Sequence, residues 1–134
     1  MSDRMLQIGE VAERVGLSLR TVRYYEEMGL LTPEKRTDGG FRLFTEEHVE
    51  RLALIKQMKP LGFSVQEMRD LLDARDAVSR AAPDGPDRTA ATDHLAAFAA
   101  AAAERCNELR DQLALAEAFA DQLRRDTRRK PPHP

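Results

Sequence analysis

Apolar residues recur at helical spacing twice near the start of the chain. The first apolar face is made by Ile8, Val11, Ala12 and Val15, and the second by Leu19, Val22 and Tyr25. Between them Gly16 permits the positive φ of a sharp turn, and the Ser18 hydroxyl can cap the second helix. The pattern predicts two short helices joined as a helix-turn-helix. An ordinary corner between two helices of a helical core fits the same residues.

The stretch after the second helix carries a hairpin signal. Residues 34–44 read EKRTDGGFRLF, in which Asp38, Gly39 and Gly40 separate two short segments that contain arginine. Aspartate followed by glycine favours the tight turn of a β-hairpin. We therefore predict a small β-hairpin, or wing, after the helix-turn-helix.

Two further helices follow the wing. One runs from Thr45 to about Lys59, with an apolar face of Val49, Leu52, Ile55 and Met58 and with Arg51, Lys56 and Lys59 facing outward. The other begins after Gly62 and Phe63, where Ser64 and Glu67 have the spacing of a capping box. Its expected buried face consists of Val65, Met68, Leu71 and Leu72.

A long helix is predicted near the end of the chain. No proline or glycine occurs from Asp93 to Arg124, a stretch that would span roughly 46 Å as a helix. Its heptads place Leu95, Ala102, Leu109, Ala116 and Leu123 at one seam position and Ala99, Cys106, Leu113 and Ala120 at the other, with Phe98 and Phe119 at the flanks. An unbroken apolar seam of this kind implies a partner helix. Folding back onto the chain's own domain is the alternative.

Composition divides the chain into four segments. Residues 1–76 form a mixed, apolar-periodic domain, residues 77–91 with Pro83, Gly85 and Pro86 are expected to be a linker, residues 92–127 form the long helix, and residues 128–134 form a proline-rich, flexible tail. The basic cluster from Arg124 to Lys130 is expected to be solvated, although contact with DNA or with a partner stays open.

Charge and cysteine content narrow the function classes. The chain has 21 basic and 23 acidic residues, so attraction to a polyanion must come from local patches. A single cysteine, Cys106, excludes an intramolecular disulfide framework, and with His48, His94 and His133 scattered we expect no metal site and no cofactor. No leader or membrane span is visible, so we expect a cytoplasmic protein without a membrane partner. No catalytic constellation is visible either, which argues against an enzyme.

The motifs together resemble the MerR family of bacterial transcriptional regulators. The resemblance covers residues 6 to about 75: IGEVAERVGLSLRTVRYYEEMGLLTP, then the wing R-x-x-GG-F-R-L-F, then the GFS turn before the fourth helix. It implies a mostly α fold, in which a winged helix-turn-helix DNA-binding domain precedes a long antiparallel coiled-coil dimerisation helix. The dimer contacts would then be made by Leu95, Phe98, Ala102, Cys106, Leu109, Leu113, Ala116, Phe119 and Leu123.

The resemblance also assigns DNA contacts. Arg20, Thr21, Arg23 and Tyr24 would reach the major groove from the second helix, whose cap is Ser18. Arg36 and Arg42 of the wing, and Lys56, Lys59 and the amide end at Ser64, would contact phosphates. Tyr25 and Phe41 belong to the same expected set, but they and Phe44 could instead be packing residues. The family commonly has tyrosine at positions 41 and 44, and Pro60 puts the aim of Lys56 and Lys59 in doubt.

The family resemblance implies a mechanism but does not identify the effector that would control it. Members bind promoters with an over-long spacer as homodimers and distort the duplex so that RNA polymerase engages both elements. The sequence shows neither the cysteine pairs of metal-sensing members nor the cysteine clusters of redox-sensing members. The large ligand domain of drug-sensing members is not seen either. An effector-independent architectural or accessory DNA-binding protein is the alternative function, and a regulator controlled by a protein partner is another. Coupling of two Cys106 thiols by oxidation is a further hypothesis, weighed against a buried core thiol.

Overall fold

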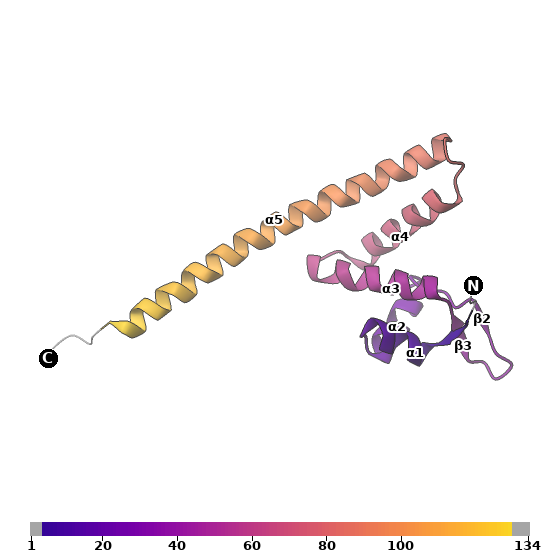
Figure 1. Cartoon of the computed structure of the whole chain (residues 1–134), viewed down its shortest axis with the longest axis horizontal. Coiled ribbons are helices and arrows are strands. Elements are labelled where there is room, and N and C mark those ends of the chain that lie inside the picture. The colour runs from indigo at the N-terminus through magenta and orange to yellow at the C-terminus, as the bar shows by residue number, and fades with distance from the viewer. Residues whose placement is uncertain (1–3, 130–134) are drawn as a thin grey trace. The chain divides into compact units, whose positions relative to one another are not determined.

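The computed structural model describes residues 4–129. The helix-turn-helix is present as α1 (Ile8–Val15) and α2 (Leu19–Glu27), which lie together in Figure 1. Gly16 ends α1 with φ 71°, and the backbone N–H of Leu17 donates to the Ala12 carbonyl at 3.0 Å. This left-handed conformation is nearly free of strain only for glycine, so the predicted turn and its cause are both confirmed.

A three-stranded antiparallel sheet forms the wing. Its strands are β1 (Leu6–Gln7), β2 (Lys35–Arg36) and β3 (Arg42–Phe44), in the order β1-β3-β2. The hairpin between β2 and β3 turns where predicted, since the Gly40 N–H donates to the Thr37 carbonyl at 2.8 Å and Gly40 has φ 83°. Two residues of β1 give too short a pattern to predict, but they tie the wing to the start of α1.

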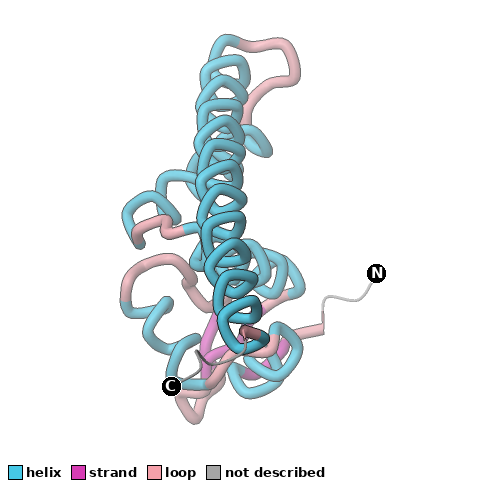
Figure 2. Tube along the Cα trace, turned by 90° about the vertical axis from the view of Figure 1, so that its left-hand side faces the viewer, coloured by secondary structure: helices cyan, strands magenta, loops and turns pink. Residues whose placement is uncertain are grey.

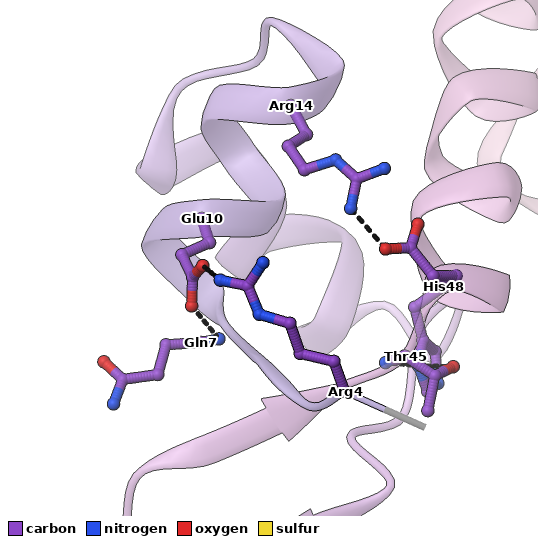
Figure 3. Close-up of polar contacts among 7 residues, drawn as sticks. Arg4, Gln7, Glu10, Arg14, Thr45 and His48 are labelled. Carbon is purple, nitrogen blue, oxygen red and sulfur yellow. Dashed lines mark hydrogen bonds and ion pairs between the residues drawn. The ribbon is translucent and has the colours of Figure 1, made fainter. Parts of the chain in front are cut away.

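The next two helices start at the predicted caps. They are α3 (Glu46–Met58) and α4 (Val65–Arg80), with the 3₁₀ helix η1 (Lys59–Leu61) between them. Ser64 and Glu67 form the predicted capping box of α4. At α3 the equivalent role of Glu67 is taken by His48, whose Nδ1 accepts from the Thr45 N–H at 2.9 Å (Figure 3).

Apolar side chains from the first four helices and the wing share one core. The fully buried ones include Leu6, Val11, Val22, Leu30, Leu31, Phe44, Leu52, Ile55 and Leu72. The predicted faces of α3 and α4 are largely right, because Leu52, Ile55, Met58, Met68 and Leu72 are buried, while Val49, Val65 and Leu71 are half-buried at the margin.

The last helix, α5 (Pro86–Arg128), begins earlier than predicted. The segment expected to be a linker, residues 77–91, is mostly helical, since α4 continues to Arg80 and α5 starts at Pro86. Proline suits the first position of a helix, where its missing N–H is not needed. The Arg88 guanidinium also donates to the Val78 carbonyl at 3.0 Å, and Ala91 is buried. These contacts stabilise the first turns of α5.

The chain divides into two compact units, residues 1–96 and 97–134. The described part of the second unit is the remainder of α5, one uninterrupted helix (Figure 2), and none of its side chains is buried. Large apolar side chains stay exposed along it: Leu109, Leu113, Leu115, Phe119 and Leu123. Among the described residues, none of the helices combines the length and the hydrophobicity that a membrane span requires.

Candidate nucleic-acid interface

The outer face of α2 presents long polar side chains. Arg20, Arg23 and Tyr24 are exposed, and Thr21 is half-buried beside them. Tyr25 differs, because only 3% of it is exposed and it packs in the core. This burial favours the packing alternative for Tyr25. The other side chains form a surface with guanidinium and hydroxyl groups, which suit base edges and phosphates.

Both ends of α2 are fixed by side chains. At its start the Ser18 hydroxyl accepts from the Thr21 N–H at 3.0 Å and donates to the Thr21 hydroxyl at 2.8 Å. At its C-cap Arg69 donates to the Met28 carbonyl, and beyond the helix Arg51 donates to the Leu30 carbonyl at 3.4 Å. Helix termini leave carbonyls without helical partners, and arginine is one way to satisfy them.

These two arginines were missed by sequence reasoning. Arg69 was not singled out, and Arg51 was expected to face outward, whereas it also pairs with Asp76 at 2.8 Å. The only available signal was their placement on the partly polar sides of α3 and α4. Their contacts tie the C-terminal end of α2 and the loop after it to α3 and α4.

The wing arginines have partners within the protein. Arg42 contacts the Glu26 carboxylate of α2, and Arg36 donates weakly to the Gly40 carbonyl at 3.5 Å. Arg36 is the more exposed of the two arginines. At the tip of the wing Phe41 is 63% exposed, whereas Phe44 at the end of β3 is fully buried. Phe44 is thus a packing residue, and Phe41 remains available for contact.

Lys56 and Lys59 lie in different environments. The Lys56 ammonium donates to the Val15 carbonyl at 2.9 Å, so it supports the end of α1 and the turn at Gly16. An added Cβ at Gly16 would lie 2.9 Å from Nζ, so the end of the Lys56 side chain would have to shift. An ammonium has three donors, so Lys56 can still contact a phosphate. Lys59 is exposed beside Pro60 in η1.

The amide end of α4 is already occupied in part. The Ser64 N–H donates to the Glu67 carboxylate at 2.9 Å, and the Glu67 N–H donates to the Ser64 hydroxyl at 3.1 Å. A carboxylate at a helix N-terminus is stabilised by the same partial positive charge that would attract a phosphate. Ser64 therefore acts first as a cap.

An ion pair and a histidine connect α1, α3 and the loop before β2. Arg14 and Glu46 form a hydrogen-bonded pair at 2.5 Å, which lowers the pKa of the Glu46 carboxyl and raises the pKa of Arg14. Burial lowers the pKa of His48, against the opposing effect of its hydrogen bond to the Thr32 backbone. The ring of His48 also meets Phe44 edge to face, with centroids 5.4 Å apart.

The expected dimer contacts all lie on α5. Leu109, Leu113, Phe119 and Leu123 are 43–65% exposed, and Ala116 is exposed as well. Leu95, Phe98, Ala102 and Cys106 are half-buried. Leu115 is 75% exposed, but the heptad places it away from the seam. The predicted seam therefore runs along a single helix.

A surface groove lies between α4 and the first turns of α5. It encloses about 660 Å³, with alanines including Ala74 and Ala91 on its floor and Asp70, Asp73, Asp87 and His94 among its other lining residues. Among the described residues, no group of three or more histidine, cysteine or acidic side chains is placed to hold a metal ion.

Comparison with known proteins assigns this arrangement to a family. The model described as "MerR HTH family regulatory protein" matches residues 6–75, and the model described as "MerR, DNA binding" matches residues 49–125. The chain belongs to the MerR family of DNA-binding transcription regulators. Among curated MerR relatives, the regulator CueR of Yersinia pestis is 43% identical over 67 residues, which are 50% of this chain and 48% of CueR. The matched region spans between 32% and 53% of the length of such curated relatives.

Solved MerR structures share the fold. A MerR family regulator from Bacillus thuringiensis aligns with a TM-score of 0.70 at 21% identity, over 91% of this chain and 99% of that one. HiNmlR, described as a MerR family regulator lacking the sensor domain and bound to promoter DNA, aligns with a TM-score of 0.61 at 22% identity, over 92% and 88%. Both matches confirm the predicted winged helix-turn-helix followed by a long helix.

Proposed function

We propose that this chain is a sequence-specific transcriptional regulator that binds promoter DNA as a homodimer and distorts an over-long promoter spacer to activate transcription. One observation carries the proposal. The head, residues 6–75, presents Arg20, Arg23 and Tyr24 on the exposed face of a capped α2, and the chain continues into a helix with an exposed apolar seam. The head supplies the reading surface, and the seam supplies the second copy.

Base reading is assigned to α2. Arginine can donate two hydrogen bonds to guanine in the major groove, and a well-formed pair of this kind discriminates by about 1–3 kcal/mol. Arg20 and Arg23 are exposed at a spacing that puts both on one face of α2. Thr21 and Tyr24 add hydroxyl groups beside them.

Phosphate contacts are assigned to residues around α2. Lys59, Lys56 and Arg36 are exposed cations on η1, α3 and β2. Contacts to phosphate position a protein on the duplex and carry no sequence information directly. Because the whole chain has slightly more acidic than basic residues, these local cations must account for the electrostatic part of binding.

The second copy is assigned to the seam of α5. Leucine side chains that are about half exposed in one chain can be buried by a partner helix, at roughly 1.5–3 kcal/mol for each fully buried side chain. Two heads joined by a stiff coil would be held at a fixed separation. Contacts made by both heads could then offset the few kcal/mol that bending or untwisting a binding site costs.

Footprinting combined with in vitro transcription tests this function. The template is the promoter of the chain's own gene, and RNA polymerase is added with and without the protein. Protection across the spacer with open-complex formation supports the activator. Protection without stimulated transcripts would instead select the accessory, effector-independent DNA-binding protein, and no protection on this or neighbouring promoters would contradict sequence-specific regulation.

A further inference from the structure

The two strands of the wing place two positive charges opposite each other. Arg36 of β2 is the direct cross-strand partner of Arg42 of β3. Like charges directly opposite on an antiparallel pair destabilise it. The strands themselves are only two and three residues long, so they contribute few backbone hydrogen bonds to offset this repulsion.

A carboxylate from α2 lies against this pair. The Nε of Arg42 is 2.8 Å from Oε1 and 2.9 Å from Oε2 of Glu26, and the Nη2 of Arg36 is 3.9 Å from Oε2. The Glu26 side chain is 13% exposed, whereas those of Arg42 and Arg36 are 35% and 53% exposed. The acid is therefore the most buried member of the three, and it comes from the last turn of the reading helix.

The geometry of Glu26 indicates that charge, more than hydrogen bonding, fixes it there. Arg42 donates its hydrogen bond to Oε2, while the buried Oε1 accepts none. A buried carboxylate with an unsatisfied oxygen is costly unless positive charge lies beside it. Arg42 supplies that charge, and its Nε–H is directed at Glu26 within the protein.

We propose that Glu26 is a positioning residue that serves as the internal counter-ion of the wing. It fastens β3 to α2, so that the wing follows the helix that reads bases, and it withholds Arg42 from the phosphate backbone. Arg36 is left as the wing arginine that meets DNA. This proposal rests on the proposed DNA-binding function, and it replaces the expectation that both wing arginines neutralise phosphates.

Removing the carboxylate charge should change DNA binding in a particular direction. In Glu26→Gln the Arg42 guanidinium loses its counter-ion, and a DNA phosphate becomes the anion that can replace it. Each additional phosphate neutralised steepens the slope of log K against log salt by about 0.9. Glu26→Gln should therefore bind non-sequence-specific duplex more tightly at low salt, with a steeper salt dependence and a smaller ratio of specific to non-specific affinity.

Glu27→Gln is the matched control. Glu27 is the next residue of α2, it is exposed, and its substitution changes the net charge by the same amount. A general loss of negative charge would steepen the salt dependence of DNA binding alike in both variants. Thermal unfolding of each variant, followed by circular dichroism, reports any structural damage separately from the salt slope.

The experiment measures fluorescence anisotropy of a mixed-sequence duplex with the full chain at several salt concentrations. We expect the slope of log K against log salt to be steeper for Glu26→Gln than for Glu27→Gln by the equivalent of about one phosphate contact. The added slope should disappear in the double variant Glu26→Gln/Arg42→Gln. Equal slopes for the two single variants, or an added slope that survives Arg42→Gln, would overturn the proposal.

Two single substitutions keep the test decisive if Glu26→Gln does not fold. Arg42→Gln alone should have the same slope of log K against log salt as the unaltered chain. Arg36→Gln alone should have a slope reduced by the equivalent of about one phosphate contact. A reduction by Arg42→Gln equal to that by Arg36→Gln would overturn the assignment. An unaltered chain that shows no salt-dependent DNA binding would instead contradict the proposed function itself.

Discussion

The head and the part of α5 beyond Ala96 differ in how far their apolar side chains are buried within one chain. In the head the large apolar side chains of the core are buried, and Phe44, Leu52 and Leu72 are at most 1% exposed. Helix ends in the head are capped by named groups, including Ser18, Ser64 and Arg69. In the described residues beyond Ala96 no side chain is buried, and Leu113 is 57% exposed.

This contrast indicates that one chain suffices for the head but not for the helix. Most helical stability in proteins comes from packing of an amphipathic apolar face and not from helix propensity. The distal α5 has the apolar face and lacks the packing within the chain. A second copy of the same helix supplies a surface of the same chemistry, and this is the basis of the proposed homodimer.

The largest expected effect comes from a charge placed in the seam. Leu113→Glu should abolish dimerisation, because it removes the burial of two leucines per dimer that are 57% exposed in the single chain, worth about 2–3 kcal/mol in total, and adds two acids to the interface. Leu115→Glu is the matched control, since Leu115 is 75% exposed and lies off the seam. Sedimentation velocity of both variants checks this prediction. Equal dimer content in the two would contradict the seam.

A core substitution separates the stability of the head from that of the dimer. Phe44→Ala should destabilise the head by about 3–5 kcal/mol, because it empties a fully buried site. Phe41→Ala, at a site 63% exposed, should cost less than about 0.5 kcal/mol. Urea unfolding at fixed protein concentration measures both. Similar losses for the two phenylalanines would show that the wing is not anchored as described.

The function of the head is tested with the helix left intact. Arg23→Ala should lower specific DNA binding by about 1–3 kcal/mol, because it removes a base contact. Lys59→Ala should weaken binding to all sequences alike and reduce the salt slope by about one. Anisotropy titrations on a target and a scrambled duplex distinguish them. If both variants lose equally on both duplexes, the division between base and phosphate contacts is wrong.

The smallest effect is a pH dependence confined to the head. The folded-state pKa of His48 is lowered from the ordinary value of 6.5, because burial disfavours its charged form. The unfolded chain then binds more protons than the folded chain below that value, so this contribution to stability is complete above about pH 6.5 and is lost on acidification.

His48→Gln should remove this component of the pH dependence. Glutamine at the third position of α3 can keep the capping box with Thr45, so the helix start is preserved. Urea unfolding of both proteins between neutral and mildly acidic pH measures the difference. An unchanged pH profile in the variant would exclude His48 as the group responsible.

Sequence reasoning succeeded where local chemistry decides structure. The glycine turn at Gly16, the hairpin near Gly40 and the capping box at Ser64 depend on residues within a few positions, and all are present. The start of α5 was misplaced because Pro83, Gly85 and Pro86 suggest a break, whereas Pro86 occupies the first turn of the helix.

The candidate site was harder to predict, because its contacts join distant parts of the chain. The Lys56 contact with Val15 spans 41 residues, and the Glu26 contact with Arg42 spans 16. A side chain's type shows that it can bind a phosphate, but not that a closer partner already holds it. The burial of Tyr25 shows the same limit, since adjacent tyrosines look alike in sequence and face opposite environments.

The most direct test of the central claim, that two copies pair through α5, is the mass of the particle in solution. Light scattering coupled to size exclusion should give twice the chain mass of 15.1 kDa at micromolar concentration. The Leu113→Glu variant should return to the mass of one chain. A single-chain mass for the unaltered protein across this range would contradict the account.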